Sequence, residues 1–199
     1  SLVGLKRWPS APFRARRALH HKMILVLRFI LDVLQQWTAR AIPLNSHHPH
    51  KSHSILYTDA EFHRSVDGMS GGLGAVLIDS SGQRWSAGCT APPSLLTACL
   101  PRLTQILPLE MAAIGSALIN FSDNLSPLIL IFCDNMSDAC MLAAGISGAI
   151  DLQGMVMIAH FVLKRLKVMW WVEYVPSQSN IADEPSRKPY NFSYLDVPV

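Results

Sequence analysis

Residues 128–135 read LILIFCDN, and this stretch decides the fold class. Six consecutive apolar residues are typical of a short β-strand that is covered on both faces, as the central strands of α/β proteins are. Asp134 follows the run directly, so a carboxylate stands at the carboxyl end of a buried strand. In open α/β sheets, functional sites lie in the crevice outside that end of the strands. The stretch therefore predicts an α/β domain with Asp134 in or beside a site.

Further strand and helix patterns flank this run. Besides residues 128–133, the predicted strands are 55–60, 73–79, 83–89 and 168–175, with Ser80-Ser81-Gly82 as a hairpin turn between the second and third. The predicted helices are 105–121, capped by Thr104, then 136–145, 150–167 and 180–187. The order βββαβααβα predicts a five-stranded mixed sheet with helices on both faces.

Composition limits the class of protein. Half of the 199 residues are hydrophobic, which is enough to form a core and excludes wholesale disorder. The most apolar segment, residues 23–37, contains Arg28 and Asp32, so we expect no membrane span. The four cysteines form no C-x-x-C pair, which favours a reducing compartment without structural zinc. With no secretion signal recognised, we expect an intracellular location: cytoplasm, nucleus or virus-like particle.

Charge divides the chain unevenly. Residues 1–40 carry a net charge of +7 and the remainder a net charge of −4. A polyanionic partner near the basic arm is one interpretation, and an ordinary solvated basic face is the other. We expect a basic arm, docking helix (23–39) and polar linker over residues 1–52, a folded domain over 53–190 and a tail over 191–199. The first residue is Ser rather than Met, which favours an excised piece of a longer polypeptide.

Four carboxylates stand at positions that need an explanation. Asp59 ends the first strand on the same face as apolar residues, and Glu110 lies in the apolar stripe of the helix 105–121. Asp134 ends the buried strand, and Asp183 follows the last strand. Taken singly, they can be strand-end turn formers, a boundary carboxylate and an acid in the first turn of a helix.

Taken together, the four carboxylates favour a metal centre. Acids that converge in a crevice repel one another and lose hydration, which is costly unless cations neutralise them. Ligands that offer only oxygen favour Mg²⁺, with Mn²⁺ able to substitute. Two such ions about 4 Å apart form a clamp for phosphodiester cleavage.

Five sequence segments resemble motifs of the ribonuclease H domain. Their residues are most similar to those of retroelement and pararetrovirus-like reverse transcriptases. The segments, in order, are YTDA (57–60), GGLGAVL (71–77), LPLEMAAIGSAL (107–118), FCDN (132–135) and VEYVPSQSNIADEPSR (172–187). By position, residues 1–52 resemble the end of the polymerase thumb or connection region. The resemblance implies an endonuclease that hydrolyses the RNA strand of RNA–DNA hybrids, within a reverse transcriptase polypeptide.

The resemblance also implies roles for individual residues. Asp59 bridges two metal ions, Glu110 and Asp134 hold one of them, and Asp183 holds the other. The expected contacts to the hybrid are Gly71, Gly72, Asn135, Asn180 and Arg187, although for Asn180 a cap on the last helix is the favoured alternative.

Other functions remain open at this point. The principal alternative is a catalytically silent connection module that scaffolds a polymerase and binds nucleic acid, although such copies usually lose one or more of the acids. An integrase-like nuclease on the same fold fits poorly, because it needs a different set and order of carboxylates. An ordinary α/β domain with coincidental acids is the last alternative.

Overall fold

The computed structural model describes residues 24, 27–28, 52–66 and 68–187. The chain divides into two units, Ser1–His47 and His48–Val199, and all the elements below belong to the second. The predicted helix over residues 23–39, apart from 24 and 27–28, and the tail 191–199 lie outside the described residues. The limits given above for the three parts of the chain therefore stay predictions.

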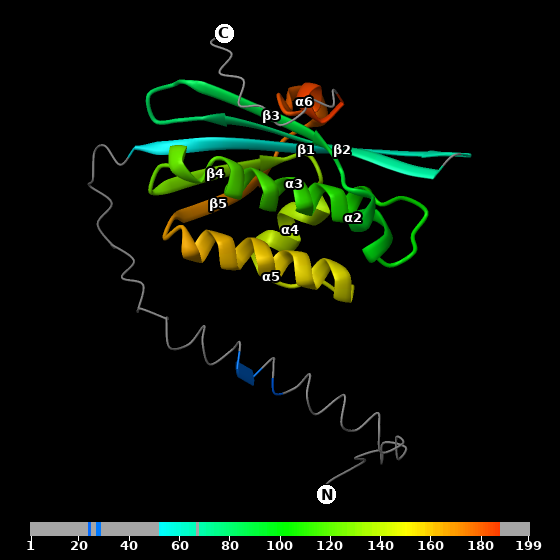
Figure 1. Cartoon of the computed structure of the whole chain (residues 1–199). Helices are drawn as coiled ribbons and strands as arrows, with labels where there is room; N and C mark the ends of the chain where they lie inside the picture. Colours follow the sequence, from blue (N-terminus) through cyan, green and yellow to red (C-terminus); the bar gives the residue numbers. More distant parts are fainter. Residues whose placement is uncertain (1–23, 25–26, 29–51, 67, 188–199) are drawn as a thin grey trace, which may run out of the picture. The chain divides into compact units, whose positions relative to one another are not determined.

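A five-stranded mixed sheet forms the centre of the domain, as predicted (Figure 1). Its strands are β1 (His53–Ser65), β2 (Gly68–Ile78), β3 (Arg84–Thr90), β4 (Leu128–Cys133) and β5 (Met169–Tyr174). They lie in the order β3-β2-β1-β4-β5. The first three strands form an antiparallel meander, whereas β4 is parallel to both β1 and β5.

Helices cover both faces of the sheet, but unequally. One face carries α2 (Pro93–Ala98), α3 (Ile106–Asn120), α4 (Met136–Ala144) and α5 (Ile150–Arg165), and the other carries the short α6 (Asp183–Arg187) (Figure 1). Two 3₁₀ turns, Ser122–Asn124 and Ser177–Ser179, complete the elements. Within the described residues, no helix combines the length and the apolar character needed to cross a membrane.

The predicted elements need four corrections, one of which is that the last helix begins at Asp183 rather than at residue 180. Helix α2 was not predicted, because a helix of six residues that begins with a proline is too short to show helical periodicity. The N-cap of α3 is Gln105 rather than Thr104, although the Thr104 hydroxyl accepts a hydrogen bond of 3.2 Å from the Ile106 N–H. Strands β1 and β2 pair with each other as far as Ser65 and Gly68, beyond the predicted ends, and this extension carries mostly polar side chains.

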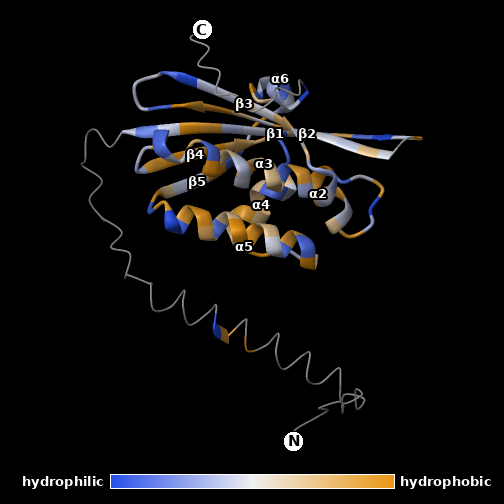
Figure 2. Cartoon of the chain, in the orientation of Figure 1, coloured by the Kyte–Doolittle hydropathy of each residue, from blue (hydrophilic) through white to orange (hydrophobic). Residues whose placement is uncertain are grey.

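The core lies between the sheet and the helices of the more fully covered face. Ile129, Ile131 and Cys133 of β4 are completely buried and pack in the same cluster as Leu118 of α3 and Val156 of α5. Figure 2 shows hydrophobic residues along β4 and α5. The alternate residues of β4 are only half-buried, since α6 packs on β1, β2 and β3. Strand β4 is therefore covered on both faces, as predicted, but less completely on the face that carries α6.

Strand register places two of the acids side by side. In the parallel pair of β1 and β4, Thr58 is the register partner of Cys133, and Asp59 and Asp134 are the next residues on their strands. Strand β4 ends at Cys133, whereas β1 continues to Ser65. The carboxyl end of β4 therefore opens a space beside Asp59, which the beginning of α3 can reach.

Candidate metal centre

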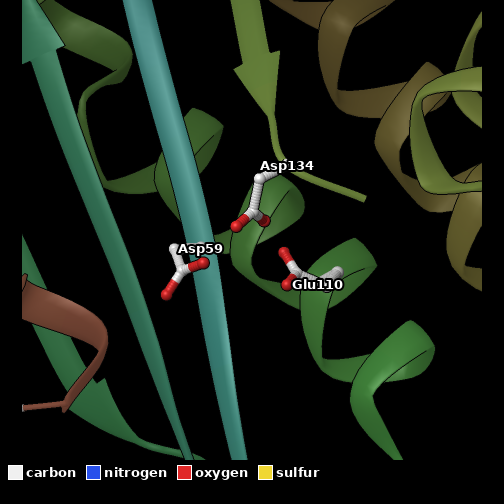
Figure 3. Close-up of side chains that lie close together, drawn as sticks. All are labelled: Asp59, Glu110 and Asp134. Carbon is white, nitrogen blue, oxygen red and sulfur yellow. The ribbon is translucent and has the colours of Figure 1, made fainter. Parts of the chain in front are cut away.

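Three of the four predicted carboxylates meet at this end of the sheet. Asp59, Glu110 and Asp134 each offer a carboxylate oxygen, and these three oxygens lie within 4.8 Å of one another. Figure 3 shows the three side chains directed toward a common space, Asp59 from β1, Glu110 from α3 and Asp134 from just beyond β4. Their spacing suits one small cation, because oxygen ligands that share an ion come within a few ångströms of one another.

Burial makes negative charge costly at two of these carboxylates. Only 5% of Asp59 and 3% of Glu110 is exposed. Burial is the largest cause that raises the pKa of Glu110 to about 9, and the charges of Asp59 and Asp134 add to it. Burial also raises the pKa of Asp59 to about 6, with a hydrogen bond from Ser186 acting against it. Without a cation, Glu110 therefore retains its proton at neutral pH.

The oxygens present fit a divalent cation. The Glu110 Oε2 atom is buried and has no hydrogen-bond partner among the described residues. A buried polar atom without a partner is rare, and an ion is one of the recognised explanations. The three ligands offer only carboxylate oxygen, which hard cations such as Mg²⁺ and Mn²⁺ prefer over zinc.

Asp183 lies next to this group but outside it. Its Oδ1 atom accepts hydrogen bonds from the Arg187 guanidinium, 2.7 Å from Nη2 and 3.0 Å from Nε. It is nevertheless close enough for its charge to raise the pKa of Asp59. The structure thus brings three of the four predicted ligands together and pairs the fourth with a cationic side chain one helical turn away.

The two glycines predicted to contact the hybrid have packing reasons of their own. A Cβ atom on Gly71 would lie 2.6 Å from Leu109 Cδ1 and 2.7 Å from the Glu61 carbonyl oxygen. A Cβ atom on Gly72 would overlap the backbone carbonyl of Ser186. Close packing against α3 and α6 therefore accounts for these glycines without a ligand, and their contact with nucleic acid stays a prediction.

The polar residues predicted to contact the hybrid also have partners within the protein. Asn135 caps α4, because its Oδ1 atom accepts a 3.0 Å hydrogen bond from the Ser137 N–H. Arg187 pairs with Asp183, although 63% of its side chain is exposed.

Asn180 is buried and connects the last segment to β1. Its amide nitrogen donates to the Thr58 carbonyl oxygen at 2.9 Å and lies 3.5 Å from Asp59 Oδ1. Its side-chain oxygen accepts from the Ala182 N–H, at 3.2 Å. These contacts favour the structural role over the role in substrate contact.

Sequence reasoning missed two buried polar residues near the site. Asp138 is completely buried, and neither of its carboxylate oxygens has a hydrogen-bond partner among the described residues. Burial raises its pKa to about 8, and its charge contributes to the raised pKa of Glu110. Its position in α4, four residues before the buried Leu142 and therefore on the same face of the helix, was the signal that could have revealed it.

Ser186 is the second residue that was missed. It is 2% exposed, and its hydroxyl donates to Asp59 Oδ2. The sequence carries no signal for this contact, because Ser186 and Asp59 are 127 residues apart. A serine in the closing segment therefore joins the last helix to the first strand.

Comparisons with known proteins place the fold. No protein-family model and no curated protein matches the chain. Among solved structures, RNase H1 from the halophilic archaeon Halobacterium salinarum is 20% identical, with a TM-score of 0.52 over 69% of this chain and 95% of that chain. LC11-RNase H1 in complex with an RNA/DNA hybrid is 15% identical, with a TM-score of 0.54 over 68% and 95%.

A viral polymerase also matches. The foamy viral protease-reverse transcriptase in complex with an RNA/DNA hybrid is 15% identical, with a TM-score of 0.50 over 75% of this chain and 21% of that chain. The five-stranded mixed sheet and these likenesses agree with the expectation from the sequence. The chain therefore contains a domain of the ribonuclease H-like fold.

Proposed function

We propose that this domain is an endonuclease that hydrolyses the RNA strand of RNA–DNA hybrids with the help of divalent metal ions. The observation that carries the proposal is the convergence of Asp59, Glu110 and Asp134 at the carboxyl end of β4, on a ribonuclease H-like fold. The solved LC11-RNase H1 and foamy viral proteins of similar fold are in complex with such hybrids. Geometry and fold thus support the same chemistry.

In this proposal, the four carboxylates would together bind two metal ions. Asp59 faces both Glu110 and Asp134 and would share its carboxylate between ions, while Glu110 and Asp134 would complete the ligands of one. Asp183 would hold the other after releasing Arg187. Bound Mg²⁺ or Mn²⁺ supplies neutralising charge for the phosphate and a lowered pKa for water. The partly open Asp134 and the exposed Arg187 leave this side accessible to a backbone phosphate.

We further propose that the domain belongs to a reverse transcriptase. The foamy viral polymerase supports this, as does the closing segment NIADEPSR with its buried Asn180, Ala182 and Ser186. Residues 1–40, with their net charge of +7, would then contribute to the binding of the hybrid.

A second candidate function is a connection module that binds nucleic acid without cutting it. One observation favours it: the Asp183 carboxylate is paired with Arg187 and is not part of the three-carboxylate group. If that pair persists in the presence of metal, the site holds three acids and its activity is lost or much reduced.

The test is a gel assay of the full chain on a labelled RNA–DNA hybrid with Mg²⁺ or Mn²⁺. We expect cleavage of the RNA strand, no cleavage of an RNA–RNA duplex, and no activity in EDTA. Asp134→Asn should lower the rate by more than about 100-fold, whereas Asp123→Asn, at an exposed acid outside the three-carboxylate group, should not. Binding of the hybrid without cleavage would favour the connection module, and equal cleavage by Asp134→Asn would reject the metal centre.

A further inference from the structure

Asp59 is held from the face of the sheet that carries α6. Its Oδ2 atom accepts a hydrogen bond from the Ser186 hydroxyl, and its Oδ1 atom lies 3.5 Å from the Asn180 amide nitrogen. Figure 3 shows one oxygen of Asp59 directed toward Glu110 and the other toward the side of the ribbon of α6. One carboxylate thus faces the other acids on one side and a buried hydroxyl on the other.

The Ser186 hydroxyl has a choice between two acceptors. Its oxygen lies within hydrogen-bond reach of Asp59 Oδ2 and 2.9 Å from the Asp183 backbone carbonyl oxygen. A hydroxyl carries one proton, so a full hydrogen bond to one acceptor weakens the bond to the other. Because Ser186 is only 2% exposed, water cannot easily take the place of either partner. The hydrogen bond that Asp59 accepts from Ser186 therefore affects the bond between Ser186 and the Asp183 backbone at the start of α6.

Three glycines fix the height of this turn above the sheet. A Cβ atom on Gly72 or Gly74 of β2 would overlap the Ser186 backbone, and one on Gly88 of β3 would overlap the Pro185 carbonyl oxygen. The backbone of α6 therefore lies directly on β2 and β3, and any side chain at these positions would lift it. We call Gly72, Gly74 and Gly88 the glycine seat.

We propose that Ser186 is a positioning residue of the metal centre, seated by these glycines. Its hydroxyl fixes the rotation of the Asp59 carboxylate, so that the opposite oxygen is presented to the metal together with Glu110 and Asp134. It also joins Asp59 to α6, so that Asp59 and Asp183 are placed as a unit. This inference rests on the proposed function, because it assigns a role within the same site.

The first test measures Mn²⁺ binding to the full chain by titration calorimetry, without nucleic acid. Loss of a group that orients a metal ligand typically weakens metal affinity by about 10- to 100-fold. We expect a weakening in that range for Ser186→Ala and none for Ser179→Ala, which removes an exposed hydroxyl from the same segment. In the cleavage assay, Ser186→Ala should need more Mn²⁺ for half-maximal rate and should recover at high Mn²⁺, which loss of folding would not allow.

A second variant disturbs the seat and keeps the hydroxyl. Gly74→Ala should displace Ser186 and weaken Mn²⁺ binding, whereas Gly154→Ala, where a Cβ atom meets nothing within 4 Å, should not. Unchanged Mn²⁺ affinity in both Ser186→Ala and Gly74→Ala, with normal binding by the unmodified chain, would overturn this inference alone. Absence of Mn²⁺ binding in the unmodified chain would overturn the proposed function and this inference with it.

Discussion

Glu110 has a strongly raised pKa, and this has a measurable consequence for stability. Its pKa is about 9 in the folded chain and 4.5 in its ordinary state. The folded chain therefore keeps a proton that the unfolded chain loses, so stability is fully retained below about pH 4.5 and falls as the pH rises toward 9.

Glu110→Gln should remove this loss. In EDTA, we expect no gain in the free energy of unfolding near pH 4.5 and a gain that grows by up to about 1.4 kcal/mol per pH unit above it. Urea denaturation at pH 5 and pH 8 measures the difference. A variant less stable than the unmodified chain at pH 8 would show that Glu110 is a structural partner instead of a strained ligand.

Asp138→Asn distinguishes the effect of a buried carboxylate on stability from an effect on hybrid cleavage. The pKa of Asp138 is raised by burial from 3.8 to about 8, so its ionisation destabilises the fold over that range of pH. We expect Asp138→Asn to stabilise the chain at pH 8 as Glu110→Gln does, yet to keep hybrid cleavage, which Glu110→Gln should lose. Loss of cleavage with normal folding would place Asp138 in the site itself.

The sequence reveals some of these residues and conceals others for physical reasons. Glu110 and Asp134 are visible because a carboxylate inside an apolar pattern breaks a local rule. Ser186 obeys every local rule, and its partner is distant in the chain. The pairing of Asp183 with Arg187 was equally hidden, because an i,i+4 acid–base pair on a short helix has the same sequence whether or not the acid also binds metal.

Predictions of helices and strands hold where the packing of the element agrees with its local sequence pattern. Strand β4 was predicted at its observed bounds, since its six apolar residues are bounded by Pro127 and Asp134. Helix α6 has only five residues, too few to be stable alone, and it depends on the glycine seat. The sequence shows the glycines but not the atoms that pack closely against them. Gly71 and Gly72 were therefore predicted to contact nucleic acid, with no account of their packing within the protein.

The segment between α2 and α3 is fixed by an ion pair that the sequence did not suggest. Arg102 donates to both oxygens of Asp151 at the start of α5, at 2.6 and 2.7 Å, and the Leu100 N–H donates to the same carboxylate at 2.9 Å. The Arg102 hydrogen bond is the main reason that the pKa of Asp151 lies well below its usual range.

Arg102→Ala should lower the free energy of unfolding at pH 7 by about 1–3 kcal/mol, the range for a charge-assisted pair with little exposure. The Asp151 contribution is present above pH 3.8 and is lost as the pH falls below it, so the difference between variant and unmodified chain should narrow near pH 2–3. Urea denaturation at both pH values measures this. An equal loss of unfolding free energy in Arg102→Ala at both pH values would mean that packing, rather than the ion pair of Arg102 with Asp151, stabilises the segment.

Gly154→Ala tests whether a substitution in α5 can raise the stability of the chain. The glycine is exposed within the helix, and a Cβ atom there meets nothing within 4 Å. Alanine should therefore stabilise the chain by about 0.5–1 kcal/mol through helix propensity. Thermal denaturation should show a higher midpoint than for the unmodified chain, and a lower midpoint would reveal a constraint on α5 outside the described contacts.

Across the whole molecule, the fold brings together residues that are far apart in the chain. Parallel pairing of β1 with β4 aligns Asp59 and Asp134, α3 supplies Glu110 past the end of β4, and α6 holds Asp59 from the other face. The chain after residue 40 carries a net charge of −4, whereas residues 1–40 carry a net charge of +7. On the proposed function, the basic residues before position 41 would therefore supply most of the attraction to a polyanionic hybrid.

The most direct test of this account is a crystal structure of the full chain grown with Mn²⁺ and measured at a wavelength where manganese scatters anomalously. We expect an anomalous peak bound by oxygens of Asp59, Glu110 and Asp134, at about 2.1 Å, the distance typical of a small hard cation. Clear anomalous signal elsewhere in the crystal, with none between these three carboxylates at saturating Mn²⁺, would contradict the account.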